Sequence, residues 1–376
     1  MNCPWFGAED FAILRLEVGR LICYIVHEMV ESILYEKLSG ARVRCGVCQR
    51  RCLISEGKMG YCHTRLNSKG RLYTLVYGEV SAQHIAPIEI KPLFHFYPNS
   101  RAFSLGTLSC NFRCIGCQNW HIAHSDPGVG RTEYVSPEES VRLARQYNCQ
   151  GLSWTYNEPT IWLEYTIDGA RLAKEEGLYT TYVTNGFMTP EALDRIGPYL
   201  DAFRVDIKGF RNDFYREIAN VGAFKGILEV TKRAKERWEM HVEVVTNIIP
   251  GYNDDEGQLR DIARWIRDDL GEDTPWHVTR FIPHLKLSNL PPTPVETLES
   301  ARQMGMEEGL RFVYLGNVPG HPSENTYCYS CGKSIIERHN WMVLSFSIEK
   351  GKCRYCGVKI PIVGHYVGVK GQHDES

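Results

Sequence analysis

The stretch that decides the fold spans residues 109–120 and reads SCNFRCIGCQNW. Its cysteines, Cys110, Cys114 and Cys117, follow the spacing Cys-x3-Cys-x2-Cys, and no fourth cysteine lies nearby. A structural zinc site uses four protein ligands, and an electron-transfer cubane usually has four cysteines. Three thiolates on a [4Fe-4S] cluster leave one iron open to an exchangeable ligand. The spacing therefore favours an open iron–sulfur cluster; the alternative is a zinc loop with a ligand from elsewhere.

The sequence around this loop alternates strands with helices. Ser136 and Thr293 each precede a proline and an acidic residue, a pattern that predicts helix N-caps. Repeated βα units predict a parallel sheet with right-handed crossovers. Six or seven strands are too few for a closed eight-stranded barrel, so we predict an α/β fold with a partial (β/α)6-type TIM barrel. The expected strands are Ala102–Leu108, Gly151–Thr155, Tyr179–Val183, Ala202–Val205, His241–Asn247, His277–Ile282 and Leu310–Leu315.

Polar residues follow the ends of three successive strands after the cysteine loop. In barrels and open α/β sheets, chemistry collects in the loops after strand C-termini. Any one of these residues alone is as compatible with a plain turn, and the acid and base of the third pair are compatible with a structural ion pair. Together they predict a binding site around the cysteine loop. The candidates are Asn157, Glu158, Thr184, Asn185, Asp206 and Lys208.

These motifs resemble those of the radical SAM superfamily. The resemblance implies that Cys110, Cys114 and Cys117 hold a [4Fe-4S] cluster whose open iron binds S-adenosylmethionine (SAM), and that an electron cleaves SAM to a 5′-deoxyadenosyl radical. It also implies that Glu158 receives the SAM ammonium group. The Thr-Asn-Gly and Asp-x-Lys elements are similar to those of glycyl-radical-enzyme activases. One position departs from the usual pattern, because Gly116 stands where the superfamily usually has an aromatic residue.

Longer strings resemble one family in particular, the AmmeMemoRadiSam-system radical SAM enzymes, often described as similar to pyruvate formate-lyase activating enzyme. This resemblance implies association with Memo-type and AMMECR1-type proteins and an electron donor such as ferredoxin or flavodoxin. It leaves open whether the radical abstracts hydrogen from a protein glycine or from a small molecule. The strings lie at residues 87–98, 117–120, 156–160, 205–210 and 276–281.

Two further cysteine groups flank the central one, and each is a complete four-ligand set. The second has paired Cys-x2-Cys knuckles and is typical of a zinc ribbon. The first is less regular, so zinc and an auxiliary iron–sulfur cluster both remain open for it. The two sets are Cys45, Cys48, Cys52 and Cys62, and Cys328, Cys331, Cys353 and Cys356.

The sequence divides into four parts. We expect an amphipathic helical segment at 1–43, with its apolar period over residues 9–38, and a cysteine-rich module and linker at 44–100. The partial barrel is expected at 101–320 and the zinc-ribbon-like module at 321–376. No apolar run approaches the roughly 20 residues that span a bilayer, and no signal-peptide pattern is present, so a cytoplasmic protein without a membrane partner is expected.

Charge argues against one alternative function. The chain has 43 Lys and Arg against 45 Asp and Glu, for a net charge of −2. A nucleic-acid-binding protein usually carries a basic patch with interleaved aromatic residues, which this sequence lacks. A second class, a metal-stabilised adaptor or RNA-binding protein without radical chemistry, is therefore less favoured than an oxidoreductase-type enzyme that uses SAM.

Overall fold

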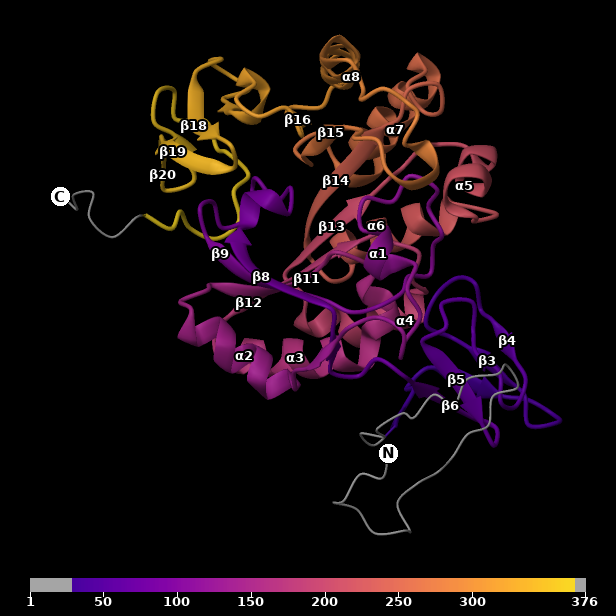
Figure 1. Cartoon of the computed structure of the whole chain (residues 1–376). Coiled ribbons are helices and arrows are strands. Elements are labelled where there is room, and N and C mark those ends of the chain that lie inside the picture. Colours follow the sequence, from indigo (N-terminus) through magenta and orange to yellow (C-terminus); the bar gives the residue numbers. More distant parts are fainter. Residues whose placement is uncertain (1–28, 369–376) are drawn as a thin grey trace.

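The computed structural model describes residues 29–368, and its centre is one eight-stranded sheet (Figure 1). The strand order is β16-β15-β14-β13-β12-β11-β9-β8, in which seven strands run parallel and β8 lies antiparallel to β9. Among the described residues β8 and β16 do not pair, so the barrel is open. The strands are β8 (Ala82–Pro87), β9 (Arg101–Gly106), β11 (Gly151–Trp154), β12 (Tyr179–Thr184), β13 (Ala202–Asp206), β14 (His241–Ile248), β15 (Trp276–Arg280) and β16 (Val313–Gly316).

The predicted parallel sheet is thus confirmed, with one addition. Strand β8 was not expected, and it lies before the predicted start of the core at residue 101. It pairs in register with β9, with Ala82 opposite Gly106 and Pro87 opposite Arg101. The sheet therefore begins with an antiparallel edge strand. The segment after β8 packs against the first residues of β9, β12 and β13, through Ile88, Leu93 and Phe96.

Helices connect the parallel strands and cover the outside of the sheet (Figure 1). None of the helices between residues 29 and 368 has the length and apolar composition that a membrane crossing needs. Short 3₁₀ turns and one π-helical turn, Ile266–Leu270, supplement them. The α-helices are α1 (Trp120–Ala123), α2 (Pro137–Gln146), α3 (Leu163–Glu175), α4 (Pro190–Ile196), α5 (Asn212–Ala219), α6 (Lys225–Glu236), α7 (Glu256–Trp265) and α8 (Val295–Glu307).

One of the two predicted helix caps is confirmed and the other is wrong. The Ser136 hydroxyl accepts a hydrogen bond from the Glu139 amide at 3.2 Å and caps α2. Helix α8 instead begins at Val295 without a side-chain cap. The Thr293 hydroxyl is used elsewhere, because it donates to the Ile248 carbonyl at 2.6 Å and accepts from the Phe281 amide at 2.9 Å.

The amino-terminal module consists of two small antiparallel sheets. One has the order β1-β6-β5 (Val30–Glu31, Arg71–Thr74, Arg65–Ser68), and the other is β2-β3-β4 (Tyr35–Lys37, Val43–Cys45, Leu53–Ile54). The helix predicted over residues 9–38 is wrong for residues 29–38, which contain β1 and β2 and no helix; residues 9–28 lie outside the described part. These residues form strands because they pair with later parts of the chain, Val30 with Thr74 and Tyr35 with Cys45.

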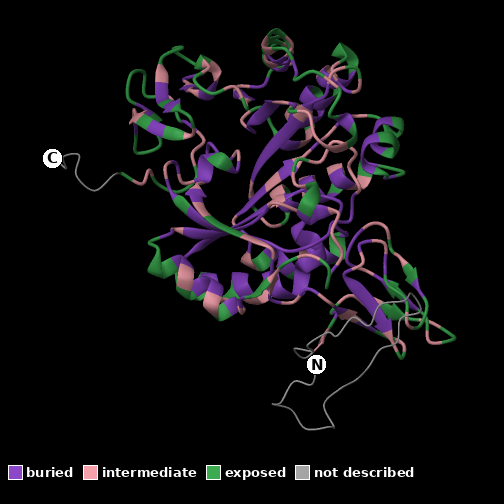
Figure 2. Ribbon diagram, viewed as in Figure 1, coloured by how far each residue is buried: buried purple, intermediate pink, exposed green. Residues whose placement is uncertain are grey.

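This module shares its core with the barrel. Val43, Ile54 and Leu72 belong to the same buried cluster as the strand residues Leu105 and Val205. Figure 2 shows the buried residues running through the central strands, with exposure concentrated on the outer faces of the helices. One ion pair inside this shared core is almost fully buried, Arg65 to Glu164 at 2.7 Å. The module is therefore packed as part of the main body.

The carboxy-terminal module has a core of its own, centred on Ile335, Ile336 and Ile360. It contains β17 (Thr326–Tyr327), β18 (Ser334–His339) and β19 (Met342–Phe346) in one sheet, and the pair β20 (Ile348–Glu349) and β21 (Lys352–Cys353). It joins the barrel where the Arg338 guanidinium donates to the Phe94 carbonyl at 2.9 Å. Its separate core agrees with a small unit stabilised from within.

Candidate functional site

The central cysteines lie in the loop that follows β9. The Asn157 amide donates to the Ser109 carbonyl at 2.7 Å, and the Arg113 and Ile115 amides donate to carbonyls at the end of α5, at 3.2 and 2.9 Å. These bonds fix the loop at the C-terminal end of the barrel, where parallel-sheet enzymes place their chemistry. Cys110, Cys114 and Cys117 all line one cavity there.

The environment of these thiols disfavours free thiolates. Burial raises the pKa of Cys110, Cys114 and Cys117, that of Cys114 to about 11, and the nearby Lys208 charge only partly offsets this for the last two. A bound metal would deprotonate such thiols because coordination favours the thiolate. The set thus suits metal coordination better than nucleophilic chemistry.

The three central thiols are not arranged as a single tetrahedral ion would require. A tetrahedral zinc site with Zn–S bonds of about 2.3 Å places its sulfurs about 3.8 Å apart. Among residues 29–368, the three central thiols do not gather within 4.8 Å of one another or of other ligand atoms, whereas another set does. The central thiols therefore do not form a compact tetrahedral set like that of a single zinc ion.

The side chains packed around Gly116 account for the small residue at this position. A Cβ atom at this position would lie 2.8 Å from Leu287 Cδ1 and 3.4 Å from Phe281 Cε2. Those two apolar side chains occupy the space beside the loop that a larger residue at 116 would need. The departure from the usual aromatic residue is therefore accommodated by residues from the loop after β15.

Glu158 is buried at the edge of the cavity, 1% exposed. Its Oε1 accepts hydrogen bonds from the Thr160 amide and hydroxyl and from the Thr184 hydroxyl at 2.7 Å, and its Oε2 accepts one from the Asn185 amide at 2.7 Å. Burial raises its pKa despite these donors. Glu158 thus joins the loops after β11 and β12, and its Oε2 retains a free lone pair.

The remaining candidates converge on the same loops. Asn185 donates to Asn111 Oδ1 at 2.8 Å and approaches Cys110 Sγ at 3.8 Å. Asn157 accepts from the Thr107 amide at 3.2 Å. All six predicted polar residues line the cavity that the cysteines line. The structure therefore brings the predicted central site together.

Asp206 and Lys208 form an ion pair at 2.8 Å, the alternative that their sequence left open beside a binding role, and the structure adds a third member. Arg204, two residues earlier on β13, also pairs with Asp206. Burial alone would raise the pKa of Asp206, but the charges of Arg204 and Lys208 lower it overall. This carboxylate is therefore ionised and shared by two cations at the cavity wall.

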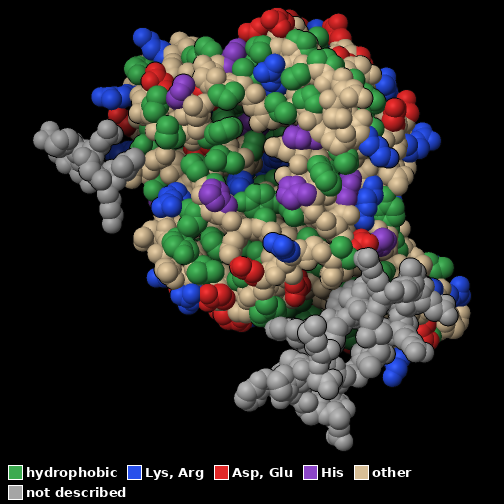
Figure 3. Space-filling view, in the orientation of Figure 1, with side chains coloured by type: hydrophobic (Ala, Val, Ile, Leu, Met, Phe, Trp, Pro, Cys, Tyr) green, Lys and Arg blue, Asp and Glu red, His purple; other side chains and the backbone are tan. Residues whose placement is uncertain are grey.

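The cavity has a volume of about 580 Å³ and extends from the cysteine loop into the barrel. Figure 3 shows the molecule hollowed near the middle of the face in view, with Lys, Arg and His side chains around the hollow. Sequence reasoning missed two of its basic residues, Lys91 and Arg204. A signal was present for both, since each is a lone cation among apolar residues, in IEIKPLF (88–94) and AFRVD (202–206).

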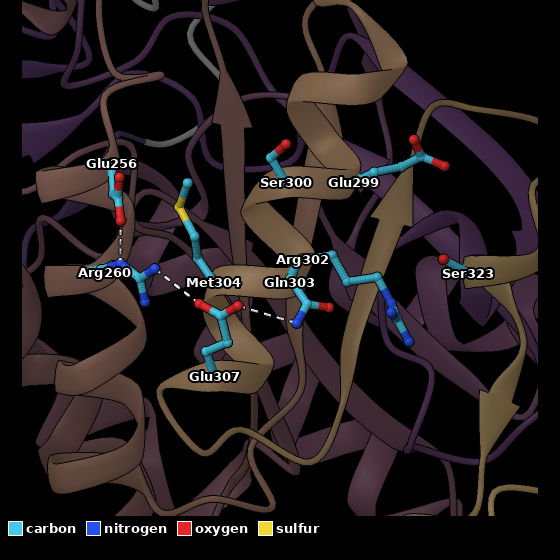
Figure 4. A pocket seen from close by; sticks show the side chains of 9 residues that line it. All are labelled: Glu256, Arg260, Glu299, Ser300, Arg302, Gln303, Met304, Glu307 and Ser323. Atoms are coloured by element: carbon cyan, nitrogen blue, oxygen red, sulfur yellow. Dashed lines mark hydrogen bonds and ion pairs between the residues drawn. The ribbon is translucent and has the colours of Figure 1, made fainter.

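A second depression lies between α7 and α8 and is a surface feature (Figure 4). There Arg260 pairs with Glu256 at 2.7 Å and with Glu307 at 2.9 Å, and Gln303 donates to Glu307 at 3.2 Å. Exposed pairs of this kind contribute little energy and are screened by salt. Its charged groups are already partnered, so it is not the candidate site.

The carboxy-terminal cysteines form a compact four-sulfur set. Their sulfurs all lie within 4.8 Å of one another, with Cys328 to Cys356 at 3.6 Å and Cys331 to Cys353 at 3.9 Å. The two knuckles have the same backbone: the Gly332 and Gly357 amides donate to the carbonyls of Cys328 and Cys353, at 2.9 and 2.8 Å. These separations match the tetrahedral zinc value of about 3.8 Å.

The amino-terminal cysteines lie next to the central loop. The Ser109 hydroxyl donates to the Cys62 carbonyl at 2.6 Å, and Cys48 pairs with Met188, just after Asn185, through a backbone bridge. Cys45 and Cys48 are buried and lie close enough to Cys52 and Cys62 for their charges to interact. Within the described chain, these four sulfurs are not as tightly gathered as the carboxy-terminal set.

Comparison with known proteins begins with the barrel. The model of the family described as "Radical SAM superfamily" matches residues 105–266, which hold the cysteine loop and the strand ends described above. An uncharacterized protein of Methanocaldococcus jannaschii is 45% identical over 337 residues, covering 89% of this chain and 100% of that protein. The chain belongs to the radical SAM superfamily.

More distant radical SAM relatives include activases. The pyruvate formate-lyase 1-activating enzyme of Escherichia coli is 23% identical over 163 residues, which cover 42% of this chain and 65% of that enzyme. Among solved structures, a domain of pyruvate-formate lyase-activating enzyme from Bacteroides vulgatus is 17% identical, with a TM-score of 0.40, covering 44% of this chain and 99% of that one. Residues 318–369 match a second model, "Bacterial Peptidase A24 N-terminal domain".

Proposed function

We propose that this radical SAM protein is an enzyme in which Cys110, Cys114 and Cys117 hold a [4Fe-4S] cluster. One observation carries the proposal: three thiols of a single loop line the same cavity as the polar residues at the ends of three successive strands. When bound, the cluster would supply one electron that breaks the C5′–S bond of SAM into methionine and a 5′-deoxyadenosyl radical, which takes a hydrogen atom from a substrate.

The residues around the cavity would bind and orient SAM. The free lone pair of Glu158 Oε2 would accept a hydrogen bond from the SAM ammonium group, since charge-assisted hydrogen bonds of this kind are strong. Asn157, Thr184 and Asn185 would hold the loops around it at fixed separation, and Asp206 with Lys208 would line the side nearest Cys114. The buried setting would keep water away from the reacting carbon.

The carboxy-terminal cysteines would hold structural zinc, because their separations suit one tetrahedral ion and no position is left open for a substrate. For the amino-terminal set, its looser spacing and contact with the cluster loop support an auxiliary iron–sulfur cluster over zinc. Such a cluster would lie beside the loop that carries Cys110. Metal analysis of the purified protein, with iron and zinc counted per chain, tests both assignments.

The finer assignment rests on the sequence strings described above. We propose membership of the AmmeMemoRadiSam-system enzymes, with Memo-type and AMMECR1-type proteins as functional partners and a ferredoxin or flavodoxin as electron donor. The activity would be of the oxidoreductase type and cytoplasmic. The activase relatives support a protein glycine as the acceptor, and the charged residues Arg204, Asp206 and Lys208 at the cavity wall support a small molecule.

Anaerobic reconstitution tests the central proposal. The full chain is loaded with iron and sulfide, reduced with dithionite and mixed with SAM, and 5′-deoxyadenosine is measured by chromatography. Formation of 5′-deoxyadenosine supports the enzyme. A protein that binds iron only at the flanking cysteines and leaves SAM intact would contradict it and favour the metal-stabilised adaptor.

A further inference from the structure

Lys91 is a buried cation inside the barrel. It follows the 3₁₀ turn Ile88–Ile90, is 5% exposed and lines the cavity that the cluster loop lines. Its Nζ lies 5.0 Å from the centroid of the Tyr156 ring, beside Glu158 in sequence. In the described part of the chain, no carboxylate forms an ion pair with it.

The charge that acts on the pKa of Lys91 is that of another cation, Arg204. Burial, and then the positive charge of Arg204, lower the pKa of Lys91 to about 8. Arg204 pairs with Asp206, but its buried Nε has no hydrogen-bond partner. Lys208 shares the same Asp206 carboxylate, so Arg204 and Lys208 have one acid between them and Lys91 has none.

None of the other acids near the cavity forms an ion pair with Lys91 in the described part of the chain. Glu158 is held by Thr160, Thr184 and Asn185, as described above. Glu243 accepts hydrogen bonds from the His241 and His277 rings, at 2.8 and 2.6 Å. Glu89 and Glu324 also line the cavity, and burial raises the pKa of both, that of Glu89 to about 7. None of these carboxylates neutralises Lys91.

The Tyr156 ring offers Lys91 a cation–π contact but no opposite charge. A buried cation without a carboxylate partner costs free energy, so proteins normally pair it or place it where a ligand pairs it. We propose that Lys91 and Arg204 bind an anionic group, a carboxylate or a phosphate, of a small-molecule substrate inside the barrel. This inference deepens the proposed function, because it assigns the substrate class of the radical SAM site. It places the anion in the cavity that the cluster loop also lines.

Binding is measured on the reconstituted full chain with SAM present and no reductant, by calorimetry with malonate, inorganic phosphate and the neutral isostere malonamide. We expect at least one anion to bind and malonamide not to bind. Lys91→Met should weaken that binding roughly 10- to 150-fold, the value of one charge-assisted hydrogen bond, while Lys91→Arg retains most of it. The matched control is Lys225→Met, which changes an exposed lysine on α6 and should leave binding unaltered.

Stability provides a second readout that does not depend on SAM cleavage. An unpaired buried lysine should cost stability, so Lys91→Met should match or exceed the unaltered protein in thermal stability without an anion, and should lose the stabilisation that the anion adds. Equal anion affinity in Lys91→Met and unaltered protein, equal binding of malonamide, or no binding of either anion would each overturn the inference. Failure of SAM cleavage alone would refute only the proposed function.

Discussion

The carboxylate of Glu158, just after β11, accepts a 2.7 Å hydrogen bond from the backbone amide of Asn185, just after β12. A side chain from one strand end therefore fixes the backbone of the next. Asn185 in turn approaches Cys110 Sγ at 3.8 Å, so Glu158 reaches the cysteine loop through Asn185. The candidate SAM site is thus held together by one buried acid.

Glu158→Gln should therefore weaken two properties at once. A glutamine amide lacks the second acceptor, so either the Asn185 amide or the Thr160 and Thr184 donors lose a partner, at a cost of about 1–3 kcal/mol of unfolding free energy. SAM affinity should fall roughly 10- to 150-fold with cluster content unchanged. Denaturant unfolding and anaerobic SAM titration measure the two effects. Glu229→Gln, at an exposed position on α6, is the control; lowered stability with unchanged SAM affinity would make Glu158 purely structural.

Cys110→Ala should abolish 5′-deoxyadenosine formation and lower the iron content of the protein, because only three thiolates hold the proposed cluster. Cys114→Ala and Cys117→Ala should do the same. Cys149→Ala removes a buried thiol that belongs to none of the three groups and should retain activity. SAM cleavage at the unaltered rate in the triple variant would show that the cluster lies elsewhere.

Cys353→Ser should damage the carboxy-terminal module first. Metal binding and folding are coupled in a tetrathiolate site, and this module has a small core of its own. We expect loss of one zinc per chain and lower solubility, while the soluble fraction keeps the barrel cluster and its absorption spectrum. Ser330→Ala, inside the first knuckle, should retain zinc. Extra iron in place of zinc would reassign the site.

The stability gained by Lys91→Met should depend on pH. The pKa of Lys91 is lowered to about 8 in the folded state, from a usual value of 10.5, so the folded protein binds fewer protons than the unfolded chain between those values. The cost of Lys91 is therefore complete below about pH 8 and diminishes as the pH rises toward 10.5. Unfolding of both proteins from pH 7 to 10 should show their stability difference shrinking; a constant difference would mean that Lys91 is not charged inside the barrel.

Much of the barrel and its site follows from local sequence. The cysteine spacing, and polar residues directly after apolar strands, predict the cavity because parallel strands bring their C-terminal ends to one edge. Three features depended on distant partners. The segment that contains β1 and β2 has a helical period, but these strands pair with β6 and β3. Strand β8 is defined only by its pairing with β9. The role proposed for Arg204 depends on Lys91, which comes from a distant part of the sequence.

The bond from the Ser109 hydroxyl to the Cys62 carbonyl has a consequence for maturation in the cell. The last cysteine of the amino-terminal group and the residue before Cys110 are joined at 2.6 Å, and both segments contribute to one continuous core. In the proposed metal-loaded protein, metal held by the amino-terminal thiols would fix the backbone at Cys62 and, through this bond, the start of the loop that carries Cys110. Under that proposal we expect the amino-terminal group to be filled before the barrel cluster.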